Sequence, residues 1–239
     1  MKILGIDSSG LVASVALVSD EAMIGEYTIN YKKTHSQTLL PMLDEIVKMI
    51  GLSLDEIDAI AVAAGPGSFT GLRIGSSTAK GLGLALNKPI VSVPTVDGLA
   101  YNLFGTDKMI CPIMDARRNQ VYTGLYEFLG DKLHVICGQK PVSIDEIVEE
   151  INERNREVIF LGDGVPVFKE QIKESIKVPY LYAPAHLSRQ RAGAIATLGG
   201  IYYKEGRAEA PAAHQPVYLR LSQAERELAQ KTGKVKKQS

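Results

Sequence analysis

The sequence predicts an α/β protein built from two similar halves. Each half opens with three short runs of β-type residues, and each then alternates helical and strand patterns. The 239 residues, of which 45% are hydrophobic and 23% charged, are enough to bury one large core or two modest ones. These observations favour a duplicated fold over one long doubly wound sheet, and they predict a ligand cleft between the halves.

The first half, residues 1–104, reads as three strands, a helix, a strand, a helix and a strand. Runs of β-type residues between polar turns predict the strands, and apolar residues at intervals of three and four predict the helices. The first helix has Thr34, His35 and Ser36 as candidates for its cap. The expected elements are strands from Lys2, Val12 and Met23, a helix over 39–50, a strand from Ala59, a helix ending near Leu86 and a strand from Pro89.

The second half, residues 105–220, repeats this opening. Three more strand patterns are followed by a helix and a further strand. A basic tail, residues 221–239, is expected to act as a solubilising end or as a weak arm that contacts phosphate. The elements expected in this half are strands from Met109, Val121 and Lys132, a helix from Ile144 and a strand from Glu157.

The charge balance argues against a protein that is basic throughout. Lys+Arg and Asp+Glu are both 27, so an RNA contact has to come from a local patch or from a partner. The chain opens without a secretory leader and offers no long apolar span, which predicts a cytoplasmic protein that does not contact a membrane. The two cysteines, Cys111 and Cys137, lie in apolar runs and are interpreted as buried free thiols.

Neither a metal site nor a catalytic site is expected. The four histidines contain no pair spaced to place two imidazoles on one helix face, and neither cysteine lies near one of them in sequence. No Ser-His-Asp arrangement can be read from the residue order. Hydrolysis is therefore poorly supported.

The stretch Ala64–Gly75, AGPGSFTGLRIG, has the composition of a loop that holds phosphate. It follows an apolar run and precedes a helix, where free backbone N–H groups face an anion in phosphate-binding proteins. The phosphate-loop signature also needs a Lys-Ser/Thr pair after its last glycine, and Leu72-Arg73 stands in its place. The same glycines are typical of a turn that lets its helix pack closely on neighbouring backbone.

Three polar turns are candidates for binding a nucleotide and its magnesium. In duplicated folds of this kind the first turn of each half supplies a carboxylate or small hydroxyl groups to the ligand. Each candidate is equally typical of ordinary turns, because Asp and Ser side chains bond to their own backbone. The candidates are Asp7, Ser8 and Ser9 in the first half, Asp115 and Arg117 in the second, and the later turn of Gly162, Asp163 and Gly164.

The two helices of the first half carry more apolar and small residues than docking on one sheet requires. Met42 and Met49 widen the apolar stripe of the first helix, which predicts a second buried face at a protein interface. Small residues recur at every fourth position of the second helix, which suits close packing on its own sheet or on another backbone. These small residues are Gly71, Gly75, Ala79 and Gly83.

Four motifs together resemble the TsaB (YeaZ) family. They are GIDSSG, THSQTLLPML, AAGPGSFTGLRIG and DARRNQVY, and the likeness extends to PVYLR from Pro216. The resemblance implies an actin-like ATPase (ASKHA) fold with two ribonuclease-H-like halves. It also implies a part in the synthesis of N6-threonylcarbamoyladenosine at position 37 of bacterial tRNAs that read ANN codons.

The resemblance further implies that this chain is not the catalyst. The related transferase TsaD carries a His-Met-Glu-Gly-His metal motif where this sequence has Thr95–Leu99, TVDGL, so both histidine ligands are absent. The implied partners are TsaD, the ATPase TsaE and a second copy of this chain, with tRNA reached through the complex. No cofactor is expected to be required, and ATP or ADP with magnesium is left as a weak ligand of the cleft or of the partner interface.

The implied interface lies on the two helices of the first half, so that the homodimer and the TsaD complex would use one surface. A bulky charge at Gly75 or Met42 should then abolish both assemblies. An active kinase or ATPase of the actin-like group remains the alternative, supported by Asp7 and Asp115. The implied interface residues are His35, Leu39, Met42, Leu43, Ile46, Met49, Phe69, Gly71, Leu72 and Gly75.

Overall fold

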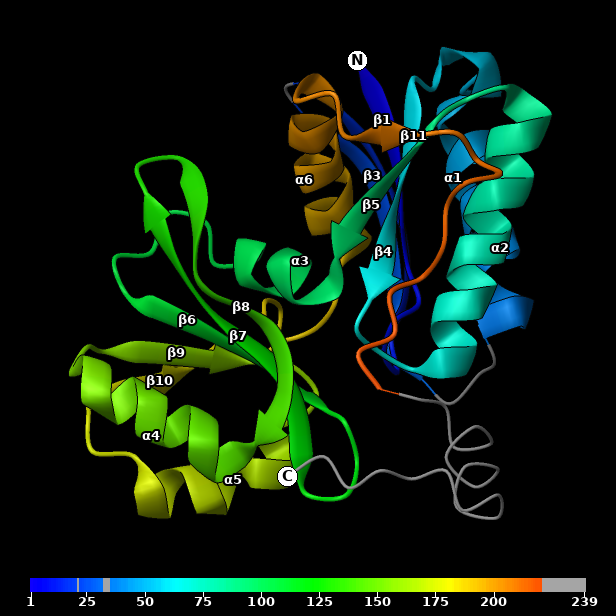
Figure 1. Ribbon diagram of the computed structural model, residues 1–239. Helices are drawn as coiled ribbons and strands as arrows, with labels where there is room; N and C mark the ends of the chain where they lie inside the picture. The colour runs from blue at the N-terminus through cyan, green and yellow to red at the C-terminus, as the bar shows by residue number, and fades with distance from the viewer. Residues whose placement is uncertain (21, 32–34, 221–239) are drawn as a thin grey trace, which may run out of the picture.

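A computed structural model describes residues 1–20, 22–31 and 35–220, and in it the chain forms two β-sheets with helices packed against them (Figure 1). The first part of the chain contains β1 (Lys2–Asp7), β2 (Ala13–Ser19), β3 (Met23–Ile29), α1 (His35–Ile50), a short 3₁₀ turn (Leu54–Glu56), β4 (Ala59–Gly65), α2 (Phe69–Leu86), β5 (Ile90–Pro94) and α3 (Thr95–Tyr101). The second part contains β6 (Met109–Asp115), β7 (Gln120–Leu129), β8 (Lys132–Ser143), α4 (Ile144–Arg154), β9 (Val158–Leu161), α5 (Val165–Ser175) and β10 (Tyr180–Tyr182), followed by α6 (Ala192–Lys204) and β11 (Ala208–Glu209).

The two sheets share one strand order, which confirms the predicted duplication. The first sheet runs β11-β5-β4-β1-β2-β3, and the second runs β10-β9-β6-β7-β8. In both, three consecutive strands form an antiparallel meander, and the next two strands lie parallel to the first. Because the carboxyl ends of the parallel strands meet at one edge, each half places its first turn beside the cleft between the halves.

Alternate side chains of the first sheet point to its two faces, and each face is covered by a layer of helices. Leu4 and Ile6 of β1 pack toward α1 and α2, whereas Ile3 packs toward α6 on the opposite face (Figure 1). On the α6 side, β4 contributes only alanines, and a Cβ added to Gly199 of α6 would overlap the side chain of Ala61. Small residues on both sides thus bring α6 close to the sheet.

The second sheet has the same layered arrangement. Helices α4 and α5 cover one face, where Phe160 and Ile147 are buried. Helix α3 covers the other face and inserts Leu99 beside Tyr126. Since α3 also packs on α6, it lies between the two halves (Figure 1).

The chain end belongs to the first half, which corrects the expected extent of the second half, 105–220. Helix α6 packs on the first sheet and β11 pairs with β5 at its edge. The segment that follows then continues along the first half, where the backbone N–H of Val217 donates to the carbonyl of Ala64 at 2.7 Å. The second half therefore ends before residue 192, and residues 192–220 complete the first.

Helices α3, α5 and α6 and strands β10 and β11 were not expected from the sequence. Helix α1 begins at His35, one turn before the expected helix, so that Pro41 falls in its second turn on the exposed side. Helices α3 and α6 and the short strand β11 lack a clear amphipathic or alternating pattern, because α3 and α6 are largely buried rather than half-exposed. The cap candidate Thr34 and the basic tail lie outside the described residues.

No helix within residues 1–20, 22–31 and 35–220 combines the length and the hydropathy that crossing a bilayer requires.

Candidate functional site

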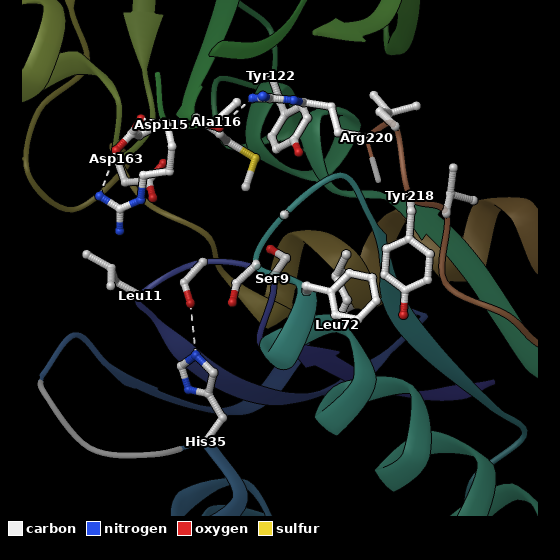
Figure 2. Close-up of a pocket in the computed structure, with 18 of the residues that line it drawn as sticks. Ser9, Leu11, His35, Leu72, Asp115, Ala116, Tyr122, Asp163, Tyr218 and Arg220 are labelled. Carbon is white, nitrogen blue, oxygen red and sulfur yellow. Dashed lines mark hydrogen bonds and ion pairs between the residues drawn. The ribbon is translucent and has the colours of Figure 1, made fainter. Parts of the chain in front are cut away.

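A cleft of about 530 Å³ opens between the halves, where the predicted polar turns meet (Figure 2). The first half contributes Ser9 from the turn after β1 and Phe69 from the start of α2. The second half contributes Asp115 and Asp163 from the ends of β6 and β9. The chain end supplies further lining residues, namely Val217, Tyr218, Leu219 and Arg220.

Asp7 lies beneath the cleft rather than on its wall. Its side chain is 1% exposed, and its Oδ1 accepts hydrogen bonds from the Ser9 backbone N–H at 2.9 Å and the Ser9 hydroxyl at 2.6 Å. Burial raises the pKa of Asp7 to about 6, although the two bonds from Ser9 lower it in part. Ser8, also buried, donates its hydroxyl to the carbonyl of Gly71 at 2.8 Å. This turn is internally satisfied.

Asp115 reaches the cleft, but it is already paired. Its Oδ1 accepts from the backbone N–H of Arg117 at 2.7 Å, and its Oδ2 lies 3.2 Å from the Arg117 guanidinium. A carboxylate held by a cation in this way is a poor magnesium ligand, because the arginine already neutralises it.

The turn of Gly162, Asp163 and Gly164 brings the start of α5 against β6. A Cβ at Gly162, whose φ is +110°, would overlap the carbonyl oxygen of Ile113, and one at Gly164 would meet the Ile113 side chain. These glycines thus serve backbone packing. Asp163 does face the cleft, and its Oδ1 has no hydrogen-bond partner in the described part of the chain. Burial raises the pKa of Asp163.

The three carboxylates of the candidate nucleotide turns lie in different surroundings. Of the three carboxylates, one is buried in its own turn, one is neutralised by arginine, and one is a buried acid with a raised pKa. Among the described residues, no three His, Cys, Asp or Glu side chains gather as a metal ion would require. The three carboxylates thus differ in how far they are available to a ligand, and Asp163 and Asp115 are the two that line the cleft.

The glycine-rich turn before α2 is closed by contacts within the protein. The backbone N–H of Ser68 donates to the Ser9 carbonyl at 2.6 Å, and the Ser68 hydroxyl caps α2 by accepting from the N–H of Gly71. Cβ atoms at Gly67 and Gly71 would overlap the carbonyl oxygens of Ser9 and Ser8. The contacts support the interpretation as a structural turn, because the backbone N–H groups of Ser68 and Gly71 are already used within the protein.

The helices α1 and α2 require a correction to the expected interface. Four of the α1 residues named for it are buried against the first sheet of this same chain and are therefore core residues, and Gly71, Leu72 and Gly75 of α2 are buried as well. His35, Met49 and Phe69 remain accessible, with Met49 72% exposed. The buried α1 residues are Leu39, Met42, Leu43 and Ile46.

A groove of about 310 Å³ lies between α1 and α2 on their outer side. Leu40 of α1, which is 53% exposed, lines one side of the groove, and Ile74 and Ser77 of α2 line the other side. His35 lines both this groove and the cleft, and its Nε2 bonds to the Gly10 carbonyl at 2.8 Å. The sequence did not predict the exposed side of α1 as a groove wall, because the buried apolar stripe dominates the residue pattern of this helix.

The stretch Thr95–Leu99 opens α3 and is buried. Asp97 accepts hydrogen bonds from Tyr126 at 2.8 Å and from Tyr202 at 3.2 Å, and burial raises its pKa. This stretch therefore joins α3 to β7 and α6 rather than facing the cleft. The expectation that Cys111 is a buried thiol is confirmed, and burial raises its pKa to about 12; Cys137 is only half-buried.

Tyr218 and Arg220 are lining residues that the sequence reading did not single out. Tyr218 stacks on Phe69 with ring centroids 4.4 Å apart, and Arg220 donates to the carbonyl of Ala116 at 2.7 Å (Figure 2). Both residues belong to the motif PVYLR, at which the resemblance ends. The sequence signal that could have identified them as lining residues is a tyrosine and an arginine two residues apart in a segment without a helix or strand pattern.

This chain is similar in sequence and in structure to proteins of known name. The sequence model of TsaD, tRNA N6-adenosine threonylcarbamoyltransferase, matches residues 22–230. The tRNA threonylcarbamoyladenosine biosynthesis protein TsaB of Bacillus subtilis is 35% identical over 225 residues, which cover 94% of this chain and 96% of that protein. The structure of YeaZ from Pseudomonas aeruginosa superposes with a TM-score of 0.77 at 25% identity, over 91% of this chain and 99% of that one.

A more distant likeness shows the fold alone. The ROK hexokinase of Thermus thermophilus matches with a TM-score of 0.50 and 11% identity, over 86% of this chain and all of that one. The protein thus has the actin-like ATPase fold, with two ribonuclease-H-like halves. Together with the match along nearly the whole sequence, this shows that the chain belongs to the TsaB (YeaZ) family of tRNA threonylcarbamoyladenosine biosynthesis proteins.

Proposed function

We propose that this protein is a non-catalytic subunit in the synthesis of N6-threonylcarbamoyladenosine at position 37 of tRNAs that read ANN codons. In this proposal it binds and activates a TsaD-type transferase through the outer side of α1 and α2. The ATPase TsaE is the third component, and tRNA is the substrate of the complex. The family match along 94% of the chain is the observation that carries the proposal.

The chemistry of the cleft supports the non-catalytic part. An actin-like kinase needs acidic groups that hold magnesium and a base that faces the acceptor. Here Asp7 is enclosed by Ser9, and Asp115 is paired with Arg117. These pairings support a non-catalytic role, because they occupy the carboxylates that such a reaction would use.

The outer side of α1 and α2 supports the docking part. The groove between them presents Leu40 and Ile74 beside the hydroxyls of Ser77 and Thr78. An apolar centre with a polar margin is the usual composition of a protein interface. The same surface serves a second copy of this chain in our proposal, so that self-association and partner binding compete.

Size-exclusion chromatography with light scattering tests this proposal. The protein alone is expected to run as a dimer, and adding the TsaD-type partner should convert it to a mixed complex. Leu40→Glu should prevent both assemblies, because it places a charge on the exposed wall of the groove without touching the core. Gly75 and Met42 are unsuitable test positions, since both are buried and a charge there would damage the fold.

Val135→Glu is the matched control. Val135 is 44% exposed on β8, in the other half of the molecule, and its replacement adds the same charge. Both assemblies should survive this change. A mixed complex that forms equally well with Leu40→Glu would refute the proposed docking surface.

ATP turnover tests the non-catalytic part separately. With ATP and magnesium present, hydrolysis in the presence of the purified chain should be no faster than in the same buffer without protein. Turnover at enzyme-like rates that Asp115→Ala abolishes would instead favour the kinase or ATPase alternative.

A further inference from the structure

We propose that residues 205–220 form a strap that closes one side of the cleft, is fastened by the buried His214, and opens as a unit while the rest of the fold stays intact. The strap follows α6, runs beside α2 and ends at the cleft, where Val217 and Tyr218 are lining residues (Figure 1). The fastening by His214 goes beyond the proposed function. A second part, that docking on α2 favours the closed strap, rests on that function.

The strap is attached to the surface of the first half rather than built into its core. Among residues 205–220, all of which the structure describes, His214 alone is buried, and the others are exposed or half-buried. Apart from the two residues of β11, which pair with β5, the segment contains no helix or strand. Segments with few buried side chains open at a lower free energy than the core to which they attach. The strap therefore has the features of a separate opening unit.

His214 joins the strap to α2 and β5. Its Nε2 lies 3.0 Å from the hydroxyl of Ser76 in α2, and its Nδ1 lies 3.0 Å from Oε1 of Glu209 within the strap. Ser92 of β5 donates to the same carboxyl oxygen at 2.6 Å and lies 2.9 Å from Nδ1. Lys80 of α2 donates to the His214 carbonyl at 3.0 Å. Removing the imidazole would leave buried polar groups of this network without partners, which is costly.

Ser76, His214 and Glu209 also have the order of a catalytic triad, in which a histidine bonds to a serine and to a carboxylate. Ser76 is only 4% exposed, and none of the three residues lines the cleft or the groove. An enclosed hydroxyl in the middle of α2 offers no access to a substrate. These three residues therefore fasten the strap and do not serve hydrolysis.

Two glycines of the first half leave room for the strap, one near each end of α2. A Cβ at Gly65, whose φ is +122°, would overlap the Val217 carbonyl oxygen, and one at Gly83 would overlap the ring of Pro211. The backbone N–H of Val217 also donates to the Ala64 carbonyl at 2.7 Å. This fit favours a single closed position of the strap.

An aromatic contact links the strap to the proposed docking surface. Tyr218 stacks on Phe69 with ring centroids 4.4 Å apart, and Arg73 donates to the Tyr218 hydroxyl at 3.3 Å. Arg73 lines the groove between α1 and α2, whereas Tyr218 and Phe69 line the cleft. A partner that holds Arg73 in place would therefore favour the closed strap, and by linkage the closed strap would favour docking.

Backbone hydrogen exchange of the full-length chain, resolved by NMR over a series of low urea concentrations, tests the strap. The Val217 amide reports on the strap, and the amides of β1 and β4 report on the core. In the unchanged protein the Val217 amide should exchange faster than the core amides and with little dependence on urea, because a local opening exposes little surface. Equal exchange rates and equal urea dependence at all these amides would overturn the separate opening of the strap.

Two variants test the fastening. His214→Ala should speed exchange at Val217 by about tenfold or more, because a buried side chain loses its hydrogen bonds. Ser76→Ala should speed it by about three- to tenfold, because it removes one bond, keeps the histidine and suits the helix. His186→Ala is the matched control, since His186 is exposed and has no hydrogen bond or ion pair among the described residues. Exchange in both test variants that equals the control would show that His214 does not fasten the strap.

The TsaD-type partner tests the coupling. Adding it should slow exchange at Val217 in the unchanged protein by about fivefold or more. In Tyr218→Ala the partner should still dock, because Tyr218 does not line the groove, but this slowing should disappear. A partner that docks and leaves the exchange of the unchanged protein as it was would overturn the coupling. Failure to dock, seen by light scattering, would overturn the proposed function and the coupling with it, whereas the fastening by His214 is judged on the free chain.

Discussion

Asp7 ends β1, yet its carboxyl group turns into the protein and away from the cleft. Ser9, two residues further on, donates two hydrogen bonds to this group. The side chain thus closes a local turn of the kind that Asp commonly forms. Its burial makes the neutral acid the favoured form in the folded state below about pH 6, because desolvation opposes the charge.

The raised pKa of Asp7 predicts a pH dependence of stability. The pKa rises from 3.8 to about 6 on folding, so the folded protein binds the proton more tightly than the unfolded chain. The stabilisation from this group is fully present below about pH 4, and it is lost as the pH rises through about 6. The loss amounts to about 3 kcal/mol of unfolding free energy.

Asp7→Asn should remove this pH dependence, because the amide keeps an oxygen acceptor for Ser9 and carries no charge. Urea unfolding at pH 4.5 and pH 7.5 measures the effect. The gain of the variant over the unchanged protein should appear at pH 7.5 and shrink at pH 4.5. Asp55→Asn, at an exposed position, is the control. A gain that is equal at both pH values would contradict the assignment to Asp7.

At the scale of single elements, α2 depends on the absence of side chains along one face. Gly71 and Gly75 lie against Ser8, and Gly83 lies against Pro211 of the returning chain end. The small-residue ridge thus serves packing within the chain. Gly81 is different, because it is exposed and a Cβ there would meet nothing within 4 Å.

Gly71→Ala and Gly81→Ala should therefore change stability in opposite directions. The first places a methyl group against the Ser8 carbonyl, which cannot move without disturbing the turn, and should cost about 1–3 kcal/mol. The second should add about 0.5–1 kcal/mol, because alanine favours the helix. Chemical denaturation of both variants measures the difference. Equal effects would mean that the close approach of α2 contributes little.

At the scale of the whole molecule, a buried polar joint links the two halves. Asp97 of α3 accepts from Tyr126 of β7, in the second sheet, and from Tyr202 of α6, on the first. Arg207 lies over the Tyr202 ring at 3.5 Å. Burial raises the pKa of Tyr126, so that its hydroxyl stays protonated and donates to the carboxyl group. The joint fixes α3 between the halves and thereby the width of the cleft.

Tyr126→Phe should weaken this joint without leaving a cavity. It removes one of the two bonds to a buried carboxyl group, and should cost about 1–3 kcal/mol of unfolding free energy. Tyr101→Phe is the matched control, because its hydroxyl has no hydrogen bond within the described residues. Urea unfolding compares the two. A double-mutant cycle with Asp97→Asn should show coupling for Tyr126 and none for Tyr101.

The accuracy of the sequence reading differed between elements for identifiable reasons. The α1, α2 and α4 patterns were strong because each of these helices has one buried and one exposed face. Helices α3 and α6 were missed because they are enclosed between other elements, which removes the periodic contrast. At the site, the sequence predicted the positions of the polar turns, but it did not predict which side chains form hydrogen bonds or ion pairs with their carboxylates. Whether Asp115 faces a ligand or Arg117 depends on side-chain directions.

The sequence by itself determined the duplicated α/β architecture, the family and the position of the turns that border the cleft, because local patterns and motifs encode these. Only the tertiary structure decided that the α1 stripe is core, that Asp7 is enclosed, and that the chain end returns to bring Tyr218 onto Phe69 and Arg220 onto Ala116. Those outcomes depend on contacts between residues a hundred or more positions apart, such as Arg220 and Ala116 or Tyr218 and Phe69. No local pattern records them, since burial and pairing arise only when distant segments pack together.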